Sequence, residues 1–168
     1  MGTASQLAVV KPRGAAATAI SLPESVQEVP YFSGDHLLVA ASLNGGNVMA
    51  TFVDVLQGWM KDLGVNLGER GVKKSDIYDK LLQAALDKLD TSLEVDPKLR
   101  GERHAPGELG SVKGIQLQPS NLSLGDVGSA MVKGLVENLR KMMPQDIFDR
   151  YQVCVHTTAS SIMIELYE

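Results

Sequence analysis

The sequence is short of cysteine, of positive charge and of long apolar runs, and each shortage excludes a class of protein. Because Cys154 is the single cysteine, no internal disulfide can form, which is typical of a reducing compartment. The formal net charge of −4 is unlike the basic surface with which proteins bind nucleic acid. No apolar stretch reaches the roughly 20 residues that cross a bilayer, and the N-terminus lacks the basic segment of a signal peptide. We therefore expect a cytoplasmic protein without nucleic-acid or membrane partners.

Several familiar site motifs are also missing. His36, His104 and His156 lie far apart and lack the short spacings of metal ligands, so we expect no metal site. The glycine pair Gly45-Gly46 is not followed by Gly-Lys-Ser/Thr, and the chain has no GxGxxG. These absences exclude a P-loop and a Rossmann-type dinucleotide fingerprint.

What is present is an ordinary globular composition, with 168 residues of which 44% are hydrophobic and 21% charged. A compact chain of this size buries about 70% of its unfolded surface, which is enough for a core. Short β-branched segments alternate irregularly with long segments of helical period, so the pattern predicts an α/β or α+β fold. The expected strands are 6–10, 29–32, 37–42, 92–97, 110–115 and 150–156, with helices over 46–63, 75–89 and 124–142.

The three expected helices carry recognisable ends and faces. The first opens at the glycine pair and ends at Gly64, a favourable residue just after a helix. Ser75 is expected to cap the second helix with Asp76 in its first turn, and Ser123 and Asp126 form a capping-box pattern before the third. The predicted buried face of the first helix includes Val48, Phe52, Val55, Leu56, Trp59 and Leu63, and that of the second includes Ile77, Leu81, Leu82, Ala85, Leu86 and Leu89.

Three short polar segments are candidate sites. Asn44-Gly45-Gly46 precedes a long helix, where glycines allow close approach and free N–H groups suit a phosphate; an ordinary tight turn is the alternative. Residues 2–5, Gly-Thr-Ala-Ser, offer hydroxyl and backbone donors, but also fit a plain loop. Glu102 and Arg103 could pair with a substrate, or form a structural salt bridge.

Longer strings resemble the C-terminal half of the FGGY carbohydrate kinases. "GERHAP", "GSVKGI" and "LGDVGSAMVKGL" are similar to successive loop, strand and helix motifs of that half. "AASLNGGNVMATFV" and "MGTASQL" resemble its helix-opening glycine motif and its Gly-Thr loop. Lys133 stands where the family has an acid or Gln, and Ala50 where some members have a nucleotide-contacting Gln. The resemblance implies an α/β fold, namely a partial ribonuclease H-like (actin-like ATPase) domain that is the second domain of an FGGY kinase.

The resemblance also implies a function. Such kinases transfer the γ-phosphoryl group of ATP, with Mg²⁺, to a sugar. Within the family, the quoted strings resemble the members that phosphorylate a seven-carbon ketose in carbohydrate metabolism. No catalytic residue is assigned, because the family's catalytic Asp lies upstream of the Gly-Thr loop. The residues expected to contact the nucleotide phosphates are Gly2, Thr3 and Gly46, with Asn44, Gly45, Glu102 and Arg103 as further cleft residues.

The same resemblance predicts how the chain is organised. Residues 1–153 are expected to form a partial nucleotide-side domain with a loop insertion near 12–30. Residues 154–168 do not match the family pattern and are expected to form a separate tail. Two interpretations stay open: a fragment of a sugar kinase that is inactive alone, and a non-catalytic interaction or regulatory fragment that shares the fold.

Overall fold

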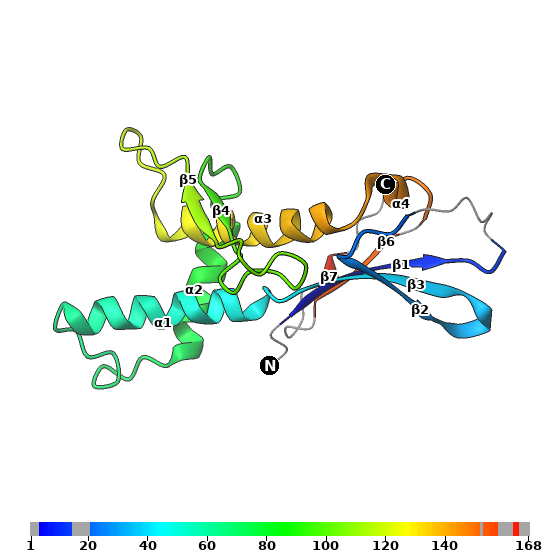
Figure 1. Cartoon of the computed structure of the whole chain (residues 1–168). Coiled ribbons are helices and arrows are strands. Elements are labelled where there is room, and N and C mark those ends of the chain that lie inside the picture. The colour runs from blue at the N-terminus through cyan, green and yellow to red at the C-terminus, as the bar shows by residue number, and fades with distance from the viewer. Residues whose placement is uncertain (1–3, 15–20, 152, 158–162, 165–168) are drawn as a thin grey trace. The chain divides into compact units, whose positions relative to one another are not determined.

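The chain divides into two units, each assembled from segments that are distant in sequence (Figure 1). Unit 1 contains Met1–Gly46, Lys98–Leu109 and Val136–Glu168, and unit 2 contains Asn47–Pro97 and Gly110–Leu135. The structure is a computed structural model, and it describes residues 4–14, 21–151, 153–157 and 163–164, the last two ranges by their backbone.

Unit 1 is built on a five-stranded sheet with the order β2-β3-β1-β6-β7, so that β1 lies at its centre (Figure 1). Its central strand β1 (Ser5–Lys11) pairs antiparallel with β3 (His36–Ser42) on one side and with β6 (Val153–Thr157) on the other. The outer strands are β2 (Val26–Pro30) and β7 (Met163–Ile164). The expected strands at 6–10, 37–42 and 150–156 are therefore confirmed, and part of the expected tail forms β6. The strand expected at 29–32 was misplaced, because β2 begins at Val26, within the expected loop insertion, and Phe32 belongs to a 3₁₀ segment.

The turn between β2 and β3 has the predicted chemistry. A short 3₁₀ segment, η1 (Phe32–Gly34), reverses the chain. Ser33 and Gly34 have φ angles of 60° and 84°, a left-handed conformation that glycine adopts without strain. The expected turn at Ser33-Gly34-Asp35 is confirmed.

The core of unit 1 forms where two helical segments cover one face of the sheet. Buried side chains alternate along the strands, as at Leu7 and Val9 of β1 and at Leu38 and Ala40 of β3. The second part of α3 (Leu124–Met142) packs against them through Leu139 and Met142, the short α4 (Gln145–Phe148) through Ile147, and the link between the two helices through Met143.

Unit 2 is mainly helical. It contains α1 (Gly46–Asp62) from Asn47 onward, α2 (Lys74–Leu86) and the first part of α3, with a two-stranded sheet of β4 (Glu94–Asp96) and β5 (Ser111–Lys113). Its buried cluster consists of Val48, Met49, Val53, Leu81 and Met131. The α1 end at Gly64 is confirmed, because Gly64 has a φ of +78° and the Val65 N–H donates to the Met60 carbonyl at 2.8 Å.

The predicted inner faces of α1 and α2 were too wide. Trp59, expected in the core, is 58% exposed, and Leu63 and Leu86 are also exposed. The buried side chains of α1, Val48, Met49 and Val53, belong to its first half, whereas Val55, Trp59 and Leu63 follow each other at four-residue spacing towards and just beyond its end. Periodicity identifies an apolar face, but only packing decides how much of that face is covered.

The predictions of the helix caps were partly correct. α2 begins at Lys74 with Lys73 as its cap residue, so Ser75 is not the cap. Asp76 lies in the first turn as expected, and its carboxylate accepts from the Lys73 N–H at 2.9 Å. For α3 the capping box is confirmed: the Ser123 hydroxyl accepts from the Asp126 N–H, and the Asp126 carboxylate accepts from the Ser123 N–H, both at 3.1 Å.

Candidate functional site

The candidate site begins where β3 ends and α1 starts. Only residues 43–45 separate Ser42, the last residue of β3, from Gly46, the first residue of α1. The predicted position of Gly46 at a helix N-terminus is therefore confirmed. The first N–H groups of any α-helix lack a carbonyl partner within the helix and carry the positive end of its dipole.

This loop touches the start of the central strand. The Ser5 hydroxyl donates to the Asn44 carbonyl at 2.5 Å. A Cβ atom added at Gly45 would lie 2.8 Å from the Ala4 carbonyl carbon and the Ser5 nitrogen, a distance that no real side chain tolerates. Gly45 is thus required for the close approach of two backbones. Gly2 and Thr3, the other expected phosphate residues, lie outside the described residues and directly precede Ala4 in the chain.

Glu102 holds the same loop from the other side. Its side chain is 1% exposed, and its carboxylate accepts four hydrogen bonds. One oxygen accepts from the Ser42 hydroxyl at 2.5 Å, from the Asn44 side-chain amide at 3.0 Å and from the Asn138 side-chain amide at 2.7 Å. The other accepts from the Leu43 backbone N–H at 3.0 Å. We call this set of Ser42, Leu43, Asn44, Glu102 and Asn138 the Glu102 network.

These contacts determine the ionisation of Glu102. Burial by itself raises the pKa of a carboxyl group, because it penalises the charged form. The four hydrogen bonds to the carboxylate outweigh burial and hold the pKa of Glu102 below its ordinary value. Glu102 is therefore an anion at neutral pH. Within the described part of the chain the partners of Glu102 are hydroxyl and amide groups, so its environment is structural but does not contain the salt bridge that the sequence suggested.

The loop that carries Glu102 is itself tightly constrained. Glu102 and Ala105 exchange two backbone hydrogen bonds, at 3.1 and 3.0 Å. Gly101 has a φ of +67°, and a Cβ atom there would lie 2.5 Å from the Pro106 carbonyl oxygen. The Gly101 carbonyl in turn accepts from the Asn44 side chain at 2.9 Å. The Gly-Glu pair of the "GERHAP" string is thus part of the support of the β3–α1 loop.

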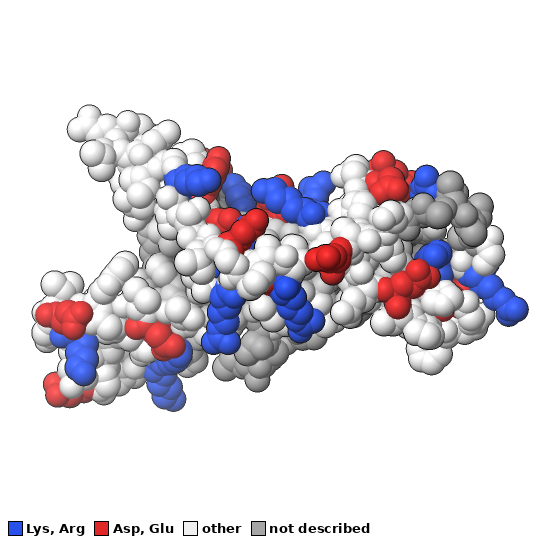
Figure 2. Space-filling view, viewed as in Figure 1, with Lys and Arg blue, Asp and Glu red and all other residues white. Residues whose placement is uncertain are grey.

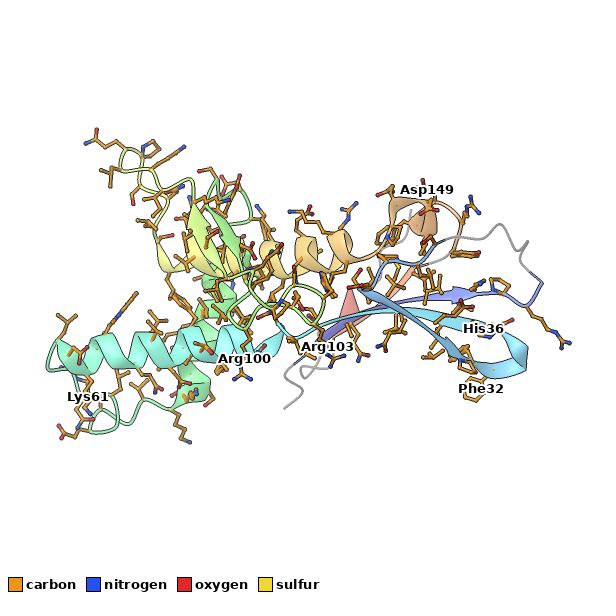
Figure 3. All side chains as sticks on the ribbon, in the orientation of Figure 1. Phe32, His36, Lys61, Arg100, Arg103 and Asp149 are labelled. Carbon is orange, nitrogen blue, oxygen red and sulfur yellow. The ribbon has the colours of Figure 1, made fainter. Side chains whose placement is uncertain are left out.

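Arg103, the next residue, is not a member of the Glu102 network. Its side chain is exposed and lines a cavity of about 140 Å³ together with His104 and residues of β2 and β3, including Val39 and Ala41. Figure 3 shows Arg103 beside the strands of the larger sheet. The structure therefore separates two neighbours that the sequence grouped together: Glu102 is buried under the loop, and Arg103 is at the surface.

The electrostatics of the surface are mixed. On the face drawn in Figure 2, basic and acidic side chains lie among one another without a large field of one sign. Among the described residues, no three His, Cys, Asp or Glu side chains come together as a metal site would require. No helix in the described part of the chain is long and apolar enough to cross a membrane.

Sequence reasoning missed Ser42 and Asn138, and it included Ser5 as part of the Gly-Thr-Ala-Ser segment without its contact to Asn44. Asn138 was detectable, because it continues the apolar spacing of Met131, Leu135 and Met142 along α3, and an amide in such a stripe indicates a buried hydrogen bond. Ser5 and Ser42 carry no comparable signal. Small hydroxyl residues at strand ends are common, and their partners lie 39 and 60 residues away.

Comparisons with known proteins extend this description. The chain is 43% identical over 145 residues to human sedoheptulokinase and 48% identical over 115 residues to the mouse enzyme. These matches cover 86% and 68% of the chain, but it spans only 29% and 23% of those relatives. No family model matches the chain.

Solved structures agree in fold. The crystal structure of xylulose kinase from Bifidobacterium adolescentis superposes with a TM-score of 0.52 at 21% identity, covering 84% of this chain and 26% of that one. The ligand-bound xylulose kinase from Lactobacillus acidophilus gives a TM-score of 0.51 at 20% identity, over 82% of this chain and 24% of that one. The structural likeness concerns the fold alone.

Proposed function

Because the chain is homologous to part of sedoheptulokinase and has the actin-like ATPase fold of the FGGY sugar kinases, we propose that it forms the ATP-binding side of a ketose kinase. In this proposal residues 1–153 correspond to the nucleotide-side domain, and residues 154–168 form a tail without counterpart in the family. The protein would act in the cytoplasm, where ATP and sugar are available.

One observation carries the proposal. The start of β1 and the β3–α1 loop meet at the N-terminus of α1, where Gly45 contacts the Ala4–Ser5 backbone. Both segments were expected, independently, to contact phosphate. A glycine-containing loop that leads into a helix N-terminus presents backbone donors to an anion. We propose that Gly2, Thr3 and Gly46 donate to the ATP phosphates, with Asn44 and Gly45 shaping the loop.

The reaction of the whole enzyme would be transfer of the γ-phosphoryl group from ATP to sedoheptulose, giving sedoheptulose 7-phosphate. Phosphoryl transfer depends mainly on positioning and on stabilising negative charge. Mg²⁺ bound to ATP would offset charge on the phosphates, and the backbone donors at Gly46 would orient them. We assign no catalytic base among the residues of this chain, and we expect the chain alone to bind ATP weakly and not to phosphorylate sugar.

The test compares two equivalent glycine substitutions in α1. Gly46→Val adds a branched side chain at the proposed phosphate contact, and Gly58→Val adds it in the helix interior, where a Cβ atom has no neighbour within 4 Å. ATP binding is measured by titration with nuclear magnetic resonance, with and without Mg²⁺. We expect Gly46→Val to lower ATP affinity at least about tenfold, or about 1.4 kcal/mol, and Gly58→Val to leave it unchanged.

Two results would contradict the proposal. One is the absence of any chemical-shift change at Gly46 and its neighbours when millimolar ATP is added to the wild-type chain. The other is ATP binding by both variants that equals that of the wild type. A parallel assay incubates the chain with ATP, Mg²⁺ and sedoheptulose and measures ADP and sugar phosphate. It tests whether this chain contains a catalytic base. Turnover by the chain alone, abolished by Gly46→Val, would show that it holds its own catalytic base.

A further inference from the structure

The Glu102 network is concentrated on one short segment. Three of the four donors to the Glu102 carboxylate belong to the consecutive residues Ser42, Leu43 and Asn44. This segment leads directly into Gly45 and Gly46, the proposed phosphate loop. A buried carboxylate that accepts backbone and side-chain donors from three successive residues fixes both their side chains and the direction of their main chain.

We propose that Glu102 is a positioning residue for the phosphate loop: it sets the conformation of Ser42–Asn44 and thereby the direction of the N–H groups at the start of α1. This inference rests on the proposed function. Glu102 does not touch the nucleotide, because its carboxylate is buried and occupied by its four donors.

The network is suited to a carboxylate rather than to an amide. Each of the four partners donates, whereas a glutamine in place of Glu102 would bring its own N–H₂ group into the cluster. If the glutamine N–H₂ group faced Leu43, it would oppose the Leu43 N–H. If it took the place of the other carboxylate oxygen, it would oppose the side-chain amides of Asn44 and Asn138. The Asn44 amide cannot turn to accept without losing its hydrogen bond to the Gly101 carbonyl.

The effect would reach the second phosphate segment as well. The Asn44 carbonyl accepts from the Ser5 hydroxyl, and Gly45 lies against Ala4 and Ser5. A rotation of the Asn44 peptide would therefore disturb the contact that holds the start of β1 against the loop. The Asn44 side-chain oxygen is buried and has no hydrogen-bond partner among the described residues, which hold Asn44 through its amide, its N–H and its carbonyl.

The experiment uses Glu102→Gln in the full chain, with Ile147→Val as a control. Ile147 is fully buried in the apolar cluster of the same unit and is not part of the Glu102 network. Each protein is examined by amide hydrogen exchange without ligand and by ATP titration. We expect Glu102→Gln to speed exchange at Leu43, Asn44 and Gly46 and to weaken ATP binding about tenfold, the effect of one misplaced charge-assisted contact. Ile147→Val should change neither.

A second variant restores one carboxylate to the cluster. In Glu102→Gln/Asn138→Asp the introduced carboxylate accepts from the glutamine N–H₂ group, and the glutamine oxygen accepts from the Leu43 N–H, so that only the Asn44 amide still faces a donor. We expect this double variant to recover slow exchange at Leu43 and part of the ATP affinity, which a loss of general stability would not explain.

The outcomes separate the two proposals. If the wild type binds ATP and Glu102→Gln binds equally well, the positioning role is wrong and the proposed function stands. If Ile147→Val weakens binding as much as Glu102→Gln, the effect is one of stability, and the positioning role is also wrong. If the wild type does not bind ATP, the proposed function fails and takes the inference with it, whatever the exchange rates show.

Discussion

A helix glycine in α3 provides a sharp test of how unit 2 is packed. Gly134 lies inside α3, where replacing glycine by alanine normally stabilises a helix by about 1 kcal/mol. A Cβ atom at this position, however, would lie 2.0 Å from the Val95 carbonyl oxygen of β4 and 3.3 Å from Pro97. An ordinary carbon–oxygen contact is about 3.3–3.6 Å. The backbone of β4 would have to move by more than 1 Å, or roughly the shortfall between these distances.

The two effects can be compared. Overpacking a well-packed site costs about 1–3 kcal/mol, and more where backbone rather than a flexible side chain must move. β4 is a three-residue strand whose pairing with β5 would be disturbed by the shift. The clash therefore exceeds the helix-propensity gain, and Gly134→Ala should lower the free energy of unfolding by about 2 kcal/mol.

Gly58→Ala is the matched control. It makes the same change in the interior of α1, where nothing lies within 4 Å of the added atom. It should raise the free energy of unfolding by about 0.5–1 kcal/mol. Urea unfolding at constant pH, followed by circular dichroism, measures both variants. An increase in stability for Gly134→Ala similar to that for Gly58→Ala would refute the close approach of α3 to β4.

Three further predictions concern single polar side chains. Because its pKa is lowered in the folded protein, Glu102 contributes stability above about pH 4.5, and this stability is lost as the pH falls through the folded pKa. The urea midpoint should therefore fall more steeply below about pH 5 for the wild type than for Glu102→Gln. Parallel plots of urea midpoint against pH for the two proteins would contradict this. Asn121 is buried and makes hydrogen bonds with Ser92, Gly114 and Gln116, so Asn121→Ala should cost about 2–3 kcal/mol, whereas Asn66→Ala, at an exposed asparagine, should cost under about 1 kcal/mol in the same urea assay. Ser123→Ala removes the hydroxyl of the α3 capping box and should cost about 1 kcal/mol by thermal unfolding, and an unchanged midpoint would argue against the cap.

The sequence by itself determined the local features of this protein. The helix start at Gly46, the end at Gly64 and the α3 capping box were predictable, because each depends on residues within a few positions of one another. Strands β1, β3 and β6 were predictable for the same reason, since β-branched runs between turn residues are local signals. β2 was expected three residues too late, and β7 was not predicted. The family resemblance was also available from the sequence, and the comparisons agree with it.

The tertiary structure alone decided which side chains are buried and what they contact. Trp59 and Leu81 are both apolar residues at helical spacing, yet the first, near the end of α1, is exposed and the second is buried, because packing covers only part of each apolar face. Glu102 was recognisable as a candidate, but not as a buried anion, since its four donors come from Ser42, Leu43, Asn44 and Asn138, which lie 36 to 60 residues away. Helix caps and turns follow from short-range chemistry, whereas burial and long-range hydrogen bonds follow from how distant segments pack together.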